Sequence, residues 1–225
     1  MDDVISRERT SQAVARHLVR QLLSGRRPGG SRIDLEEVAK ELGVSRLPVR
    51  EALLQLEHDG VVVSRYHRGV FMADLSAGTV RDHFELYGQL SAFAAGAVAR
   101  VAAPGDVEEL EAAMSRVSAA VTGDDFEKHS QEYLRLLNLG AGSPRLVVLL
   151  RSFSTFVPES FHLLDLDAGQ LAERKDGLAE VMEAIREKDP NRAHDAMLHN
   201  IRSAGEAVVA ALARDGIIAD GETRT

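Results

Sequence analysis

Apolar residues recur every three or four positions along most of this chain, which is the spacing of helices with one buried face. The first such stretch runs from Ser11 to Leu23, a second from Leu35 to Leu42, and a third from Ser45 to about His58. Asp34 can cap the second stretch, and Gly43 can end it in a left-handed conformation. The pattern therefore predicts three helices in this part of the chain.

Two short runs of strand-forming residues follow the third helix, after a turn at Asp59-Gly60. They are Val61–Val63 and Gly69–Met72, and the segment between them carries Arg65, His67 and Arg68. Three helices followed by such a hairpin predict a winged helix-turn-helix. In that fold the third helix enters the major groove of DNA, and the basic hairpin tip lies beside the backbone. Gly69 would let the hairpin approach the duplex closely.

The start of the third helix has the chemistry of a DNA-reading segment. Ser45 is a good N-cap, because its hydroxyl can accept a hydrogen bond from an unpaired amide. Pro48 falls in the first turn, where its missing N–H costs nothing. Arg46 and Arg50 are four positions apart and share one face, from which guanidiniums can reach phosphates and guanine edges. A surface helix with two solvated arginines has the same spacing, and the context of the hairpin favours DNA.

The remainder of the chain is helical by pattern. Helices are expected at Thr79–Ala103, Val107–Val121, Gly123 to about Leu139, Arg145 to about Phe156, Gln170–Lys188 and Pro190 to about Arg214. The fold class is thus mostly α, with a winged helix-turn-helix at residues 1–74 and an antiparallel bundle of about six helices at residues 80–218. Residues 75–79 are expected to form a linker, and residues 219–225 a disordered tail.

Charge is divided unevenly between these two parts. The whole chain has a net charge of −8, with 27 Lys and Arg against 35 Asp and Glu. Residues 1–74 contain 12 basic and 11 acidic side chains, whereas residues 75–225 contain 15 and 24. The acidity therefore belongs to the bundle. Local positive charge in the first part suits binding to phosphates, which depends on local charge more than on the total.

Composition excludes several classes of protein. The chain has no cysteine, so it offers no thiolate nucleophile, thiolate metal site or disulfide. It shows no phosphate-binding loop, dinucleotide-binding glycine motif or nucleophile elbow, so we do not expect an enzyme. The first ten residues are charged and lack the apolar core of a signal peptide, and no apolar run could span a bilayer. We expect a cytoplasmic protein without a membrane partner. A winged-helix scaffold that binds another protein is the remaining alternative.

The first part resembles the DNA-binding domain of the GntR family of bacterial transcription regulators. The resemblance lies in GVSRLPVREAL at residues 43–53, LEHDGVV at 56–62 and YHRGVFM at 66–72. It implies that the residues Ser45, Arg46, Leu47, Arg50, Arg65, His67, Arg68 and Gly69 form the contact surface for operator DNA. The family often has Thr where this chain has Leu47. Leu47 could contact a thymine methyl group, but we favour its packing into the domain.

The second part resembles the FCD domain of the FadR branch of that family, in which a helical bundle dimerises and binds an effector. The best anchors are residues 142–146 and 183–189. The resemblance implies a homodimer that places two recognition helices on a near-palindromic operator of double-stranded DNA.

Positions that bind a divalent metal in many FCD domains are replaced here. One Asp and three His correspond to Ser130, Leu134, Leu178 and Asn200, which make no plausible shell for a transition metal. We expect no metal and no cofactor. His129 and His199 each lie one position away, and a shifted site with His83 or His194 is the alternative.

The arginine that grips small acids in the family is also replaced, by Tyr87. The resemblance then implies a cavity lined by Tyr87, Leu90, Ser91, Ser130, Leu134, Leu178 and Asn200, with Phe93, Tyr133 and Met197 as further candidates. Such a lining favours a largely apolar effector of the fatty-acid or acyl-CoA type, since each buried CH₂ contributes about 0.8 kcal/mol. A core plugged by the two leucines, with no ligand, is the alternative.

Overall fold

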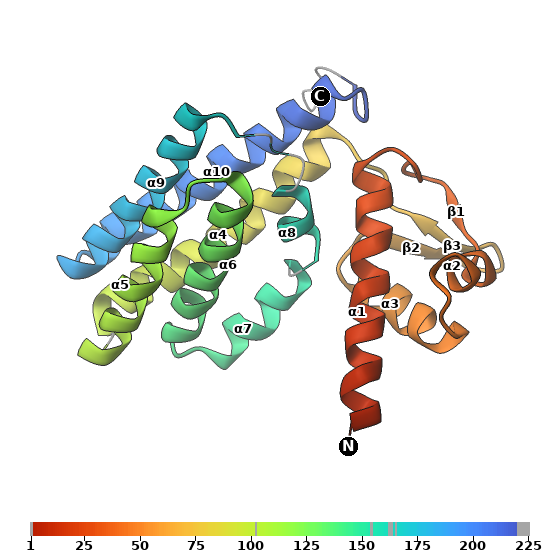
Figure 1. Cartoon of the computed structure of the whole chain (residues 1–225), viewed down its shortest axis with the longest axis horizontal. Coiled ribbons are helices and arrows are strands. Elements are labelled where there is room, and N and C mark those ends of the chain that lie inside the picture. Colours follow the sequence, from red (N-terminus) through yellow and green to blue (C-terminus); the bar gives the residue numbers. More distant parts are fainter. Residues whose placement is uncertain (1, 102, 154, 162–163, 165, 220–225) are drawn as a thin grey trace. The chain divides into compact units, whose positions relative to one another are not determined.

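The computed structural model describes residues 2–101, 103–153, 155–161, 164 and 166–219. These divide into two compact units (Figure 1). The first contains Met1–Thr79, Ser152–Ser160 and Leu212–Thr225, and the second contains Val80–Arg151 and Phe161–Ala211. Each unit is described separately below. Residues 220–225 of the predicted disordered tail lie outside the described residues.

The first unit is a winged helix-turn-helix, as predicted. Its helices are α1 (Asp2–Leu23), α2 (Leu35–Leu42) and α3 (Arg46–His58), and its strands are β1 (Arg32–Ile33), β2 (Val62–Arg65) and β3 (Gly69–Met72). The sheet has the order β1-β3-β2 and is antiparallel, with Val62 opposite Met72 and Ile33 opposite Val70. The sequence pattern did not predict β1, because two residues are too few to show an alternation.

The apolar faces identified in the sequence form the core of this unit. Leu18, Val49 and Leu56 have no exposed surface. At the start of α2, the Asp34 carboxylate accepts hydrogen bonds from the backbone N–H groups of Glu36 and Glu37, at 2.8 and 3.1 Å. Gly43 ends α2 at φ 64°, so the short turn before α3 depends on a residue that tolerates the left-handed region.

The cap of α3 differs from the expectation. Ser45 occupies the N-cap position in an extended conformation, but its side chain forms no capping hydrogen bond. An N-cap hydroxyl normally accepts from the amide two or three positions later. The third position is Pro48, which has no N–H to donate. The predicted hydroxyl bond is therefore wrong, and Pro48 removes one of its two possible donors.

The first unit also draws on segments beyond residue 74. Glu159 of α8 (Phe156–Phe161) is 3% exposed, and its carboxylate accepts from Nε of Arg20 at 2.5 Å. Arg16 lies 3.8 Å from the same carboxylate. Near the C-terminal end of the described chain, Ile217 lies directly against Gly25. The DNA-binding fold is thus completed by a helix turn and a terminal segment that are distant in sequence.

The second unit is all-helical. Its helices are α4 (Ala77–Val101), α5 (Pro104–Ala119), α6 (Gly123–Gly140), α7 (Pro144–Leu150), α9 (Ala168–Arg186) and α10 (Pro190–Arg214). The expected single helix from Arg145 to Phe156 is wrong, because the chain breaks after α7 into a 3₁₀ turn at Arg151–Phe153 and then the separate α8. Pro158 lies just beyond the expected end and falls in the first turn of α8, where proline is tolerated.

Helices α4 and α10 approach each other closely. A Cβ atom at Gly205 of α10 would lie 2.7 Å from Cβ of Phe84 on α4. Two bidentate ion pairs join the same helices, Arg81 with Glu206 at 2.8 and 3.0 Å, and Arg202 with Glu85 at 2.5 and 2.6 Å. The Arg202 guanidinium lowers the pKa of the Glu85 carboxyl to about 2. None of the helices in the described part of the chain has the length and apolar character needed to cross a bilayer.

Candidate nucleic-acid interface and bundle cavity

The recognition helix presents its two arginines to solvent. Arg46 and Arg50 are both exposed, on the first and second turns of α3. Nη2 of Arg46 lies 2.9 Å from a carboxylate oxygen of Glu36 on α2, and both side chains remain more than two-thirds exposed. Such an exposed pair is weak, so the guanidinium can exchange this partner for a phosphate or a base edge. Ser45 is also exposed and leaves its hydroxyl available for a contact.

Leu47 lies between these arginines and is 47% exposed. The interpretation that Leu47 packs into the domain is therefore wrong. It is followed by two buried residues, Pro48 and Val49, so the inward face of α3 begins only after it. An apolar side chain on this surface remains available for the methyl group of a thymine.

The hairpin carries its basic residues at an exposed tip. Arg65, His67 and Arg68 are exposed, and the backbone N–H of Arg68 donates to the carbonyl of Arg65 at 2.9 Å. The tight turn places His67 at φ 57° and Gly69 at φ 101°. The guanidinium of Arg65 lies 4.6 Å from the centre of the Phe71 ring, a cation–π contact that orients it.

Two features of the hairpin were not foreseen as parts of the site. Tyr66 at the tip is 89% exposed, and a tyrosine there has the shape and polar end to contact a sugar or phosphate. Arg32 from β1 reaches across the hairpin, and a Cβ atom at Gly69 would lie 3.3 Å from its Nε. Gly69 thus makes room for Arg32, a role that only β1 reveals. Arg27 is mostly buried and hydrogen-bonded to Gln21 and Glu37, so its charge serves the fold.

The expected effector-pocket residues are largely buried between helices. Ser91, Ser130, Leu134, Leu178 and Asn200 are each less than a tenth exposed, while Tyr87 and Leu90 are partly exposed. Burial raises the pKa of the Tyr87 phenol. The Asn200 side chain packs so closely on Gly177 of α9 that a Cβ atom there would collide with its Nδ2. Phe93 as a cavity residue is wrong, because it is 58% exposed.

The histidines of the alternative metal site are dispersed. His199 is exposed, and His194 pairs through Nδ1 with Asp195 at 2.9 Å. Burial lowers the pKa of His83 to about 4. Within the residues that the structure describes, no three His, Cys, Asp or Glu side chains come together as metal ligands would.

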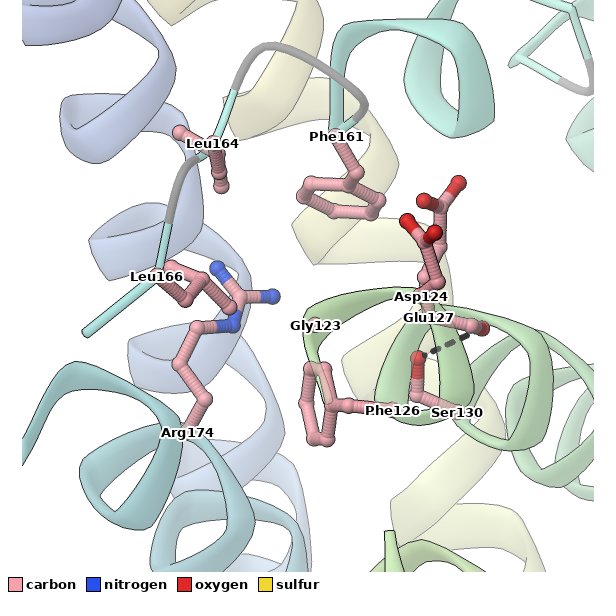
Figure 2. Close-up of a pocket in the computed structure, with 9 residues that line it drawn as sticks. All are labelled: Gly123, Asp124, Phe126, Glu127, Ser130, Phe161, Leu164, Leu166 and Arg174. Atoms are coloured by element: carbon pink, nitrogen blue, oxygen red, sulfur yellow. Dashed lines mark hydrogen bonds between the residues drawn. The ribbon is translucent and has the colours of Figure 1, made fainter. Parts of the chain in front are cut away.

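A cavity lies at the end of the bundle where α6 begins, away from most of the expected pocket residues. It holds about 40 Å³ and is lined by Gly123, Asp124, Phe126, Glu127, Ser130, Phe161, Leu164, Leu166 and Arg174 (Figure 2). Of the seven residues expected from the sequence, Ser130 lines this cavity. Its hydroxyl donates to the Glu127 carbonyl at 3.0 Å, a bond within α6.

Arg174 of α9 is the side chain that sequence reasoning missed. Its guanidinium carbon lies 4.9 Å from the centre of the Phe161 ring and 5.6 Å from that of Phe126. Burial lowers the pKa of Arg174 to about 10, which leaves the group charged at neutral pH. A signal was present in the sequence: Arg174 falls between Leu171 and Leu178 in the inward-facing stripe of α9. A charged side chain is rarely placed on the buried face of a helix unless it has a partner.

Two sequence families match the chain in the order of its two units. Residues 10–72 match the family described as bacterial regulatory proteins, gntR family, and residues 82–203 match the FCD domain. Together these ranges cover the exposed recognition helix, the hairpin and nearly all of the bundle.

Individual relatives match the chain over most of its length. An HTH-type transcriptional regulator of Mycobacterium tuberculosis is 32% identical over 212 residues, covering 93% of this chain and 85% of that protein. A probable D-xylose utilization operon transcriptional repressor of Paenarthrobacter nicotinovorans is 24% identical and covers 88% of both chains. Among solved structures, E. coli McbR/YncC matches with a TM-score of 0.65 over 89% of this chain and 97% of that one, at 18% identity. The last likeness concerns the fold alone.

Proposed function

Because the chain belongs to the GntR family of bacterial transcription regulators, we propose that it binds a near-palindromic operator as a homodimer and responds to a largely apolar effector without a metal. The observation that carries the proposal is the exposed pair of arginines on the first two turns of α3, followed by a basic hairpin. Its relatives are regulators and not enzymes.

The DNA-binding surface has two components with different roles. Arg46, Leu47 and Arg50 would read base edges in the major groove, because they form the leading end of the recognition helix. Arg65, His67 and Arg68 would hold the backbone or enter the minor groove, where positive charge is favoured irrespective of sequence. A regulator that acts on chromosomal DNA works in the cytoplasm.

The homodimer is supported by an apolar stripe on α4. Leu86, Phe93 and Val101 are 59%, 58% and 68% exposed, and Leu90 and Ala97 between them are partly exposed. These five positions share one face of the helix, while Ala95, about 200° away from Phe93, lies on the buried face. A helix that is apolar on opposite faces needs a partner on each. A second copy meeting this stripe would bring two recognition helices to the two half-sites of an operator.

The effector proposal draws on the apolar side chains within the bundle. The core between the helices contains hydroxyl and amide groups only at Tyr87, Ser91, Ser130 and Asn200 among the seven expected pocket residues. An effector could bias the DNA-binding unit only to the extent that it binds two states with different affinities. A bundle that holds no ligand remains the second candidate, since Leu134 and Leu178 are almost fully buried.

Operator binding is tested with the single variants Arg46→Ala and Arg50→Ala of the full chain. After the operator is selected from genomic fragments, each variant should weaken specific binding by about 1–3 kcal/mol, measured by fluorescence anisotropy. Arg145→Ala is the matched control, because Arg145 is exposed on the bundle. An unchanged footprint for both recognition-helix variants would overturn the assignment of the DNA-binding surface.

The effector is tested by native mass spectrometry of the purified chain, with metal analysis of the same sample. A co-purified apolar molecule without metal supports the proposal. Stoichiometric zinc or nickel contradicts it and favours the shifted histidine site. A bare dimer that takes up no apolar compound favours the plugged bundle.

A further inference from the structure

The cavity at the start of α6 contains a buried N–H donor without an acceptor in the described part of the chain. The Nε atom of Arg174 is buried and has no hydrogen-bond partner among the described residues. A guanidinium has five N–H donors, and a buried donor without an acceptor is unfavourable. Figure 2 shows this side chain reaching from α9 toward the side of the cavity formed by the start of α6. An acceptor placed in the cavity would relieve that cost.

The aromatic rings hold the guanidinium in a defined position. Phe161 and Phe126 lie 4.9 and 5.6 Å from its central carbon. Rings at these distances stabilise the cation through their electron-rich faces without satisfying its N–H groups. The arginine is thus restrained while its Nε donor is unused, which is the state expected of an anion-binding group before its ligand arrives.

The backbone of α6 adds to the same preference. Gly123 is the first residue of this 18-residue helix and lines the cavity. The first-turn N–H groups of a helix lack intrahelical acceptors, and the helix dipole places positive charge there. The Thr122 hydroxyl accepts from the Asp125 amide at 3.1 Å, so the cap satisfies one of these donors. Asp124 and Asp125 in the same turn offset the charge of the dipole, so Arg174 supplies the main attraction for a carboxylate and the remaining first-turn N–H groups supply further donors.

The remaining lining restricts the class of anion. Asp124 and Glu127 also line the cavity, across from Arg174 in Figure 2, and the Glu127 carboxylate accepts from Nε2 of Gln131 at 2.9 Å. Two carboxylates disfavour a ligand with several negative charges, such as a phosphate ester or an acyl-CoA. The other walls, Leu164 and Leu166 with the two phenylalanines, are hydrocarbon. The space of about 40 Å³ exceeds the roughly 10–15 Å³ that one water molecule needs, so it admits a carboxylate head group.

We propose that Arg174 and the start of α6 bind the carboxylate of an amphipathic monocarboxylic acid, whose hydrocarbon chain lies along Phe161, Leu164 and Leu166. This site rests on the proposed function, because it gives the largely apolar effector a head group and a location. It also separates two effector types that the sequence could not separate, since a free fatty acid fits the charges of the lining and an acyl-CoA does not.

Octanoate is the probe, and its binding to the full-length chain is measured by isothermal titration calorimetry. Octanol has the same hydrocarbon chain without the charge, and we expect it to bind at least about tenfold more weakly. This comparison requires no variant, so it does not depend on how a substitution affects folding. Equal binding of octanol and octanoate, or no binding of octanoate, overturns the proposal.

The variant Arg174→Met removes the charge and keeps an unbranched side chain. It should weaken octanoate at least about tenfold, whereas Arg145→Met should leave the affinity unchanged. Arg174→Lys keeps a charge without the planar fork and should give an intermediate affinity. Octanoate that binds Arg174→Met as tightly as the unmodified chain contradicts the site. Operator binding is measured in parallel: if it is retained while octanoate fails to bind, the monocarboxylate site fails and the regulator assignment stands.

Discussion

The two units handle positive charge in opposite ways. The DNA-binding unit displays Arg46, Arg50, Arg65 and Arg68 on its surface, where solvent screens them until a polyanion arrives. The bundle is acidic outside, and it places Arg174 in a cavity between two aromatic rings. Several exposed arginines bind a large polyanion together, through their number and local density. A single enclosed arginine can instead select one small group. Specificity for DNA should therefore be sought on the surface of the first unit, and specificity for a small ligand at the cavity around Arg174.

The largest effect on operator binding is expected from substitutions in the exposed apolar stripe of α4. Replacing Leu86 and Phe93 together with Asp puts two charges on the exposed stripe of α4 and should separate the proposed dimer. Because linked half-site binding adds about 10²–10⁴ in effective affinity, operator binding should fall by about a hundredfold or more. Analytical ultracentrifugation gives the oligomeric state. Leu149→Asp is the control, since Leu149 is 48% exposed on α7 and lies outside the stripe.

If the double variant remains a dimer and binds the operator normally, the stripe is not the dimer contact. The exposed apolar stripe of α4 would then not be the surface that brings the DNA-binding surfaces of two copies together.

A second prediction concerns the rigidity of the bundle that surrounds Arg174. Gly205→Ala introduces a Cβ atom 2.7 Å from Cβ of Phe84, at the contact between α10 and α4. Overpacking of this kind costs about 1–3 kcal/mol, read from thermal unfolding. Gly105→Ala is the matched control, because nothing lies within 4 Å of its added Cβ. Equal melting temperatures for the two variants would show that the α4–α10 contact yields easily.

These two predictions depend on features that the sequence reveals to different degrees. The faces of α1 and α3 could be predicted because each alternates between apolar and polar residues with a helical period, and burial of one face follows. The bundle helices were predicted for the same reason. The break between α7 and α8 was missed because the apolar spacing continues through it.

The candidate sites divide in the same way. Surface residues such as Arg46 and His67 belong to a contiguous motif, so their neighbours in sequence are their neighbours in space. The cavity joins α6, the end of α8 and α9, and its lining depends on how side chains such as Phe126 and Arg174 meet. No local pattern encodes that meeting. A family correspondence predicted a pocket on positions that are mostly buried between helices, and the packed structure showed which side chains surround Arg174.

A smaller effect is expected from Arg20→Ala in the DNA-binding unit. It leaves the Glu159 carboxylate, 3% exposed, with Arg16 at 3.8 Å as its nearest described cation. We expect a loss of about 1 kcal/mol in the free energy of unfolding, because Arg20 itself is largely exposed and part of the pairing is screened. Chemical denaturation provides the measurement, and Arg26→Ala at an exposed neighbouring position is the control. A loss below the experimental error would mean that α8 is held by its apolar side chains alone.

The smallest effects compare the two caps of the helix-turn-helix. Asp34→Ala should lower the melting temperature, because the carboxylate accepts from two amides of α2. Ser45→Ala should change stability by less than about 0.5 kcal/mol, since its side chain forms no capping hydrogen bond. Hydrogen bonds from Glu37 and Glu36 lower the pKa of Asp34 below 3.8. Its contribution is therefore complete above pH 3.8 and is lost as the pH falls through the folded-state value.

Thermal unfolding across the acidic range measures this difference. The melting curves of the unmodified chain and Asp34→Ala should converge as the medium becomes more acid, while the Ser45→Ala curve should follow the unmodified chain throughout. A Ser45→Ala variant that loses operator affinity without losing stability would assign the unused hydroxyl to DNA contact. A Ser45→Ala variant that keeps both its operator affinity and its stability would limit the base-reading residues of α3 to Arg46, Leu47 and Arg50. The DNA surface would then depend on two exposed arginines of α3, whereas the bundle cavity depends on one enclosed arginine.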